Sequence, residues 1–98
     1  MADFRQLISG PNPVLIHFFD GSYATSNQLD SMLESIAKEM GAKVRVLNIS
    51  LDQNLVLARI MQINRVPTLM IYMEEILLWR QSGITTKANI MKVLKSLN

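Results

Sequence analysis

Residues 13–19 read P-V-L-I-H-F-F, a run in which His17 is the one polar side chain. A strand with one face in water alternates apolar and polar residues, whereas a strand covered on both faces is apolar throughout. Pro13 introduces the run, so the strand itself spans Val14–Phe19. The stretch therefore predicts a central strand of a sheet with further structure packed on each side.

A helix follows this strand. From Ser26 onward, apolar residues recur at intervals of three, one, three, one and three, which is the spacing of one face of an α-helix. Gly41 ends the helix, because glycine readily adopts the left-handed conformation common at helix ends. The apolar face consists of Leu29, Met32, Leu33, Ile36, Ala37 and Met40.

The next stretch, K-V-R-V-L-N-I at residues 43–49, begins as an alternating strand. Lys43 and Arg45 lie on one side of it, and valines lie on the other. A strand, a helix and a second strand in succession imply parallel pairing through a right-handed crossover.

Two shorter helices are also predicted. Asp3 can cap one near the N-terminus, and Asp52 or Asn54 can cap another that runs through about Gln62. The later helix is more apolar than one buried stripe requires, which suggests a homodimer or partner face over residues 55–63. Its apolar residues are Leu55, Val56, Leu57, Ile60, Met61 and Ile63.

The C-terminal third predicts a hairpin and a helix. Its strands cover residues 69–73 and 76–81, joined by a tight turn at Glu74-Glu75. Gly83 follows, and a threonine then caps the last helix. The candidate caps are Thr85 and Thr86, and the apolar stripe is Ile90, Val93, Leu94 and Leu97.

The predicted order is thus α-β-α-β-α-β-β-α. It indicates an α/β fold: a three-layer sandwich of about four strands in a mixed sheet, with helices on both faces. A chain of 98 residues is large enough for one core, so we expect a single domain over residues 1–98.

Composition excludes several classes of function. The formal charge is only +2, and the lysines and arginines are scattered, so no nucleic acid is expected. With no cysteine and one histidine, disulfides, thiol catalysis and a metal site are not expected. No segment has the length of a membrane span or a signal peptide, so we expect no membrane association, no cofactor and a cytoplasmic location.

Four features in register resemble the thioredoxin-like superfamily. They are P-V-L-I-H-F-F, D-Q-N at residues 52–54, V-P-T at residues 66–68, and Gly83. The resemblance runs from Val14 to the C-terminus. It implies a cis peptide bond before Pro67 and a W-C-x-x-C motif at the loop after the first strand.

The motif is absent from that loop. The corresponding residues are Ser22, Tyr23, Ala24, Thr25 and Ser26, so Tyr23 and Ser26 replace the two sulfur positions. Disulfide exchange needs one sulfur to attack and another to release the mixed intermediate. We therefore expect a redox-inactive member of this superfamily rather than a disulfide-exchange enzyme.

Two interior positions differ as well. The resemblance implies an aspartate where His17 stands, and often a lysine where Asn48 stands. Because a buried charge is costly without a partner, two groups that share a hydrogen bond suit a site without proton transfer. We expect His17 and Asn48 to be in contact.

In redox-active relatives, the residue before the cis-proline pairs its backbone with an extended peptide. Such a groove does not need thiols, because main-chain hydrogen bonds supply the contact. The resemblance therefore implies a protein- or peptide-binding groove at the equivalent positions. They are Ser22, Tyr23, Ser26, Val66, Pro67, Thr68, Gly83 and Ile84.

Other interpretations stay open at this point. The chain could be a thiol–disulfide oxidoreductase-family protein with a redox role by similarity, or an enzyme that uses Tyr23, Ser26 and His17. The loop hydroxyls could equally satisfy amides at the helix start, with His17 as a core histidine. Many relatives add an N-terminal strand for which this chain has no room, so residues 43–49 could be an open edge that pairs with a second copy, unless Lys43 and Arg45 deter it.

Overall fold

The computed structural model describes residues 2–21 and 27–97. Its elements follow the predicted order, with one short 3-10 helix added after the second α-helix. They are α1 (Ala2–Leu7), β1 (Val14–Phe19), α2 (Asn27–Met40), η1 (Gly41–Lys43), β2 (Arg45–Ser50), α3 (Leu55–Ile60), β3 (Thr68–Met73), β4 (Ile76–Ser82) and α4 (Lys87–Ser96).

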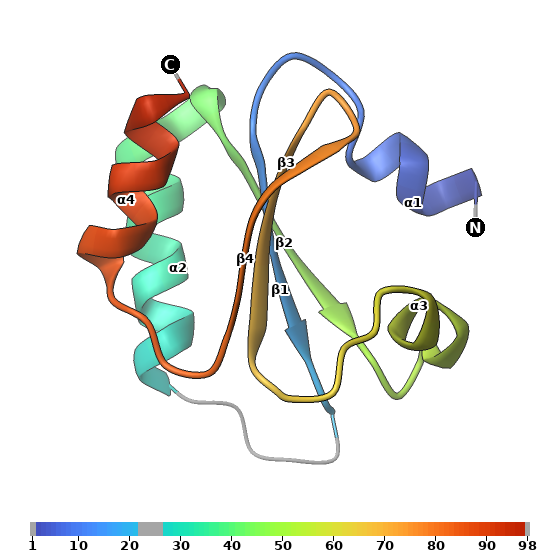
Figure 1. Cartoon of the computed structure of the whole chain (residues 1–98). Helices are drawn as coiled ribbons and strands as arrows, with labels where there is room; N and C mark the ends of the chain where they lie inside the picture. The colour runs from blue at the N-terminus through green and yellow to red at the C-terminus, as the bar shows by residue number, and fades with distance from the viewer. Residues whose placement is uncertain (1, 22–26, 98) are drawn as a thin grey trace.

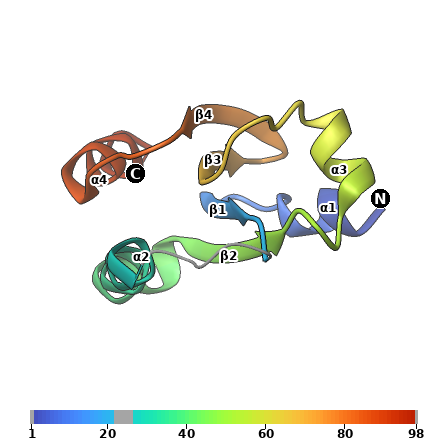
Figure 2. The same cartoon turned by 90° about the horizontal axis from the view of Figure 1, so that it is seen from below.

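The strands form one mixed sheet in the order β2-β1-β3-β4. β1 pairs with β2 in parallel and with β3 antiparallel, and β3 and β4 form the antiparallel hairpin. Helices α2 and α4 cover one face of the sheet, while α1 and α3 cover the other (Figures 1 and 2). The predicted three-layer α/β sandwich is confirmed.

β1 lies inside the molecule because both of its faces are apolar. Val14, Ile16 and Phe18 are fully buried in the core under α1 and α3. Leu15 points to the opposite face, where it packs into the core under α2 and α4. Because successive side chains of a strand point to opposite faces, β1 contributes residues to both cores.

β2 begins at Arg45 rather than at the predicted Lys43, because Gly41–Lys43 forms η1. The Arg45 guanidinium donates hydrogen bonds to the carbonyl oxygens of Leu7 and Ser9, the latter at 3.1 Å. This charged side chain therefore ties the end of α1 to β2.

The hairpin turn has neither glycine nor asparagine, yet Glu74 and Glu75 both adopt positive φ angles of 53° and 66°. Two-residue hairpin turns commonly require such angles. Their backbone amides donate to the carbonyl oxygens of Gly10 at 3.1 Å and Ile8 at 3.0 Å. Contacts with the segment after α1 thus hold a turn that the local sequence does not favour.

Of the predicted helix caps, Thr86 is confirmed, Asn54 takes the N-cap position without a side-chain bond, and Asp3 is wrong. Thr86 caps α4, because its Oγ1 accepts a hydrogen bond from the amide of Asn89 at 3.1 Å. α1 begins at Ala2, so Asp3 lies inside that helix rather than before it. No side-chain cap bond is made at Asn54, the N-cap of α3, and this helix ends at Ile60, before the predicted Gln62.

No helix in the described part of the chain has both the length and the apolar character needed to cross a bilayer.

Candidate functional site

The antiparallel hairpin brings the described part of the predicted groove together. Thr68 begins β3 and pairs with Ser82 at the end of β4, so the segments before and after the hairpin become neighbours. The amide of Gly83 donates a hydrogen bond to the carbonyl oxygen of Pro67 at 2.8 Å. The Val66–Pro67 peptide bond is cis. The three loop residues assigned to the groove, Ser22, Tyr23 and Ser26, lie outside the described residues.

Thr68 lies beneath these two segments and links them. Its side chain is fully buried, and its hydroxyl donates to the carbonyl oxygen of Arg65 at 2.6 Å. The same oxygen lies 2.8 Å from Oγ of Ser82. Since a hydroxyl has a single proton, the Ser82 hydroxyl is the donor in this second bond. One buried threonine thus connects the segment before β3 to the end of β4.

The described residues of the predicted groove include two exposed apolar side chains. Val66 is 38% exposed and Ile84 is 95% exposed, so neither is used in the core. Gly83 has a φ of +89°, a conformation that glycine adopts without strain. An added Cβ there would lie 3.9 Å from Nη2 of Arg65. Arg65 therefore places a positive charge beside these residues, a feature that the sequence analysis missed.

His17 and Asn48 are in contact, as expected from the sequence. The parallel register sets them side by side on β1 and β2, and Nδ1 of His17 lies 3.0 Å from Oδ1 of Asn48. Because a carbonyl oxygen can only accept, Nδ1 is the donor and carries the hydrogen. Burial lowers the pKa of His17 below 6.5, while the Asn48 bond and the charge of Asp30 act in the opposite direction.

A neutral buried histidine predicts a pH dependence of stability. The folded-state pKa of His17 lies below the ordinary 6.5, so the unfolded chain binds the proton first. As the pH falls below 6.5, the free energy of unfolding should decrease until the folded-state pKa is passed. Urea denaturation at several pH values measures this slope. It should be weaker in His17→Leu, and an equal slope in both proteins would contradict the assignment.

The surroundings of His17 bear on the interpretation of this chain as an enzyme. A histidine that serves as a base for a serine is oriented by a third group, commonly a carboxylate. His17 donates to the amide oxygen of Asn48, and an asparagine can also serve as the third group. His17 is only 3% exposed, and this burial is typical of a core histidine. Tyr23 and Ser26, the other residues of that alternative, lie outside the described residues.

Asp52 anchors the beginning of the loop that follows β1. Its Oδ1 accepts a hydrogen bond from the amide of Gly21 at 2.8 Å and another from the hydroxyl of Ser50. These bonds, that of Ser50 first, lower the pKa of Asp52 below its usual 3.8. Asp52 is therefore a loop anchor rather than the predicted helix cap. The side chain of Asn54 donates to the carbonyl oxygen of Ser50 at 2.7 Å.

A second apolar surface lies on α3. Leu57 faces the core, whereas Leu55, Val56 and Ile60 are 70%, 65% and 62% exposed. The excess of apolar residues noted in the sequence is thus on the surface. A homodimer through residues 55–63 stays a prediction.

In the described ranges, no three histidine, aspartate or glutamate side chains come together as metal ligands.

The family model described as Thioredoxin matches residues 1–96. This chain belongs to the thioredoxin family. This thioredoxin-like domain contains no cysteine.

Two curated relatives come from Synechocystis sp. The thioredoxin-like protein slr1139 is 26% identical over 96% of this chain and 87% of its own length. The thioredoxin-like protein slr0233 is 24% identical over 96% of this chain and 90% of its own length.

Solved structures agree on the thioredoxin fold. A mutant thioredoxin from Halobacterium salinarum superposes with a TM-score of 0.84 at 20% identity, covering 99% of this chain and 84% of that one. Chloroplastic thioredoxin z gives a TM-score of 0.82 at 25% identity, covering 98% and 87% of the two chains.

Proposed function

We propose that this thioredoxin-like domain works by binding an extended segment of another protein, without thiol–disulfide exchange. The site is the groove formed by Val66, Pro67, Gly83 and Ile84. The observation that carries the proposal is the pairing of the Gly83 amide with the Pro67 carbonyl, since it sets the segment before β3 and the segment after β4 side by side. The absence of cysteine removes the redox chemistry, but the residues that form the groove are still present.

The chemistry of the groove suits a peptide main chain. An extended peptide binds an exposed backbone through main-chain hydrogen bonds, and neighbouring side chains add selectivity. Val66 and Ile84 offer apolar contacts at the groove, and Arg65 adds a positive charge. We therefore propose a partner segment with an apolar residue and a nearby carboxylate.

A pull-down that compares the natural chain with Val66→Pro tests the proposal. Proline has no amide hydrogen, so the variant loses the backbone donor before the cis-proline. Loss of one such bond should weaken partner binding roughly tenfold. Partners recovered by the natural chain should be depleted with Val66→Pro and also with Ile84→Ser.

Leu78→Ser is the matched control, because Leu78 is an exposed aliphatic residue on β4. It should recover the same partners as the natural chain. If all three variants recovered the partners equally, the groove would not be the binding site. Circular dichroism on each variant separates loss of binding from loss of folding.

A further inference from the structure

The outer edge of β2 carries a row of backbone groups directed away from the sheet. The amide of Arg45 donates to the carbonyl oxygen of Pro13 at 3.1 Å, and the amide of Leu51 donates to that of Phe19 at 2.8 Å. In a parallel pair, alternate residues bond to the neighbouring strand. The residues between them, Val46, Asn48 and Ser50, therefore direct their backbone groups outward. The carbonyl oxygen of Ser50 already accepts a hydrogen bond from the side chain of Asn54.

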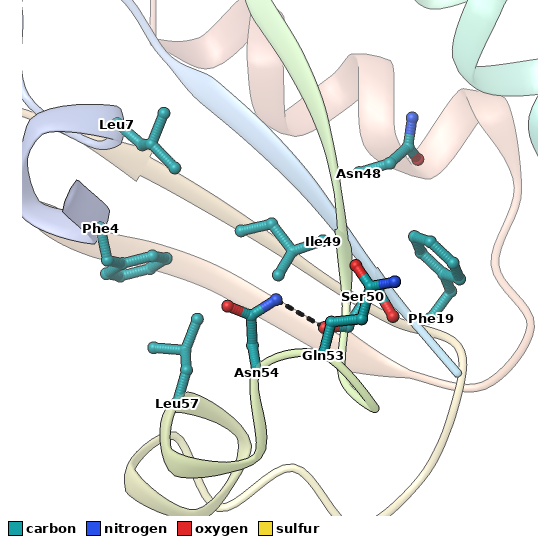
Figure 3. A pocket seen from close by; sticks show the side chains of 9 residues that line it. All are labelled: Phe4, Leu7, Phe19, Asn48, Ile49, Ser50, Gln53, Asn54 and Leu57. Carbon is teal, nitrogen blue, oxygen red and sulfur yellow. Dashed lines mark hydrogen bonds between the residues drawn. The ribbon is translucent and has the colours of Figure 1, made fainter. Parts of the chain in front are cut away.

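One pocket opens beside this edge on the face covered by α1 and α3. It has a volume of about 400 Å³. Its lining includes Phe19 and the polar residues Asn48, Ser50, Gln53 and Asn54. The apolar wall on the side of α1 and α3 consists of Phe4, Leu7, Ile49 and Leu57. Figure 3 shows these side chains on one side of the β2 ribbon and Asn48 on the other. The pocket is suited to a bulky apolar side chain.

A second pocket, of about 410 Å³, opens beside the same edge on the face covered by α2. Leu33, Ala37 and Val46 form its apolar part, and Asp30 and Glu34 add two carboxylates one helical turn apart. An apolar wall with acidic groups at the rim suits a lysine or arginine, whose stem packs on apolar surface while its charge stays in water.

Asn48 lines both pockets, so they flank one point of the strand. Successive side chains of a strand point to opposite faces. A strand added beside β2 would therefore send the side chain opposite Asn48 into the acidic pocket, and its neighbours toward the apolar pocket. The two pockets match the alternation of a single extended peptide.

We propose that the edge of β2 binds an extended segment of a partner protein in which apolar and basic residues alternate. This site is separate from the cis-proline groove. The partner segment adds a fifth strand to the sheet, with its basic residue beside Asp30 and Glu34 and its apolar residues in the pocket of Phe4 and Leu57.

Lys43 and Arg45 were expected to deter pairing at the β2 edge, but neither charge lies where it would do so. Arg45 uses its guanidinium on the carbonyl oxygens at the end of α1. Lys43 lies in η1, outside the strand. Open edges are commonly protected by charged residues of this kind, and here the exposed centre of the edge carries Val46 and Asn48 instead.

Charge complementarity favours a different protein over a second copy of this chain. In a symmetric pair, each copy presents the same surface to the other. Pairing of two β2 edges would thus bring the Asp30 and Glu34 pairs of both copies close together. It would also place Val46 or Asn48, rather than a basic residue, in the acidic pocket.

Fluorescence anisotropy with a short labelled peptide of alternating leucine and lysine tests the proposal. Reversing both charges, Asp30→Lys with Glu34→Lys, should weaken binding by about tenfold or more. The same double variant should gain affinity for a peptide of alternating leucine and glutamate. Glu34 is exposed and Asp30 is partly buried in the first turn of α2, so circular dichroism is used to check that the variant folds.

Two further variants locate the peptide. Val46→Pro removes an outward amide and should also weaken binding. Glu74→Lys, a matched change of charge on the hairpin turn, should leave it unchanged. If the double variant did not lose affinity for the leucine–lysine peptide and gain affinity for the leucine–glutamate peptide, the proposal would be overturned. Absence of binding by the natural chain would overturn it as well and leaves partner capture by the groove untouched. Weakening by Ile84→Ser but not by Val46→Pro would also overturn it, because the peptide would then bind in the cis-proline groove.

Discussion

Replacing Phe18 by alanine is expected to lower the free energy of unfolding by about 3–5 kcal/mol. Phe18 is fully buried at the end of β1, in the core beneath α1 and α3. β1 has strands on both sides of it, so the backbone cannot collapse into the cavity left by the ring. Urea or guanidinium denaturation followed by circular dichroism measures the loss.

Val56→Ala is the control for this prediction. Val56 is 65% exposed on α3, and a surface substitution of this kind usually changes stability by no more than about 0.5 kcal/mol. A loss below about 1 kcal/mol for Phe18→Ala, or an equal loss for the two variants, would show that this face of β1 is not covered as described.

The reduction of insulin by dithiothreitol is expected to proceed at its uncatalysed rate in the presence of this chain. Catalysis requires a thiolate to attack the disulfide and a second thiol to release the mixed intermediate. The chain has no sulfur of either kind, because it contains no cysteine. A side-chain phenol or alcohol at Tyr23 and Ser26 cannot perform these steps. Turbidity from the precipitating insulin chains follows the reaction.

A cysteine-containing thioredoxin under the same conditions serves as the positive control. It should shorten the delay before turbidity, while this chain should match the blank. Turbidity earlier than the blank, in proportion to the amount of chain added, would contradict the redox-inactive assignment and leave the binding proposal without its premise.

The sequence by itself was sufficient for the layers and the order of the fold. The apolar run over Val14–Phe19 and the helical spacing from Leu29 to Met40 are local patterns, and burial imposes such patterns directly. The pairing of His17 with Asn48 could also be predicted, because the family resemblance supplied the register. The absence of thiol chemistry required only a count of cysteines.

Short elements were less predictable. Asp52 could cap a helix by its position, but its carboxylate instead binds Gly21, 31 residues away in the chain. Arg45 was expected to guard a strand edge, and it binds the end of α1 instead. A polar side chain can satisfy several partners equally well, so its sequence neighbours do not decide which one it takes.

Only the tertiary structure decided the surfaces that could bind other molecules. The link from Thr68 to Arg65 and Ser82 exists because the hairpin folds one segment onto another. The two pockets beside β2 draw their walls from α1, α2 and α3, which are distant in sequence. The physical reason is that each helix or strand must bury one face, and this leaves a periodic spacing of apolar residues within its own short sequence. A binding surface depends instead on how separate elements are placed against each other.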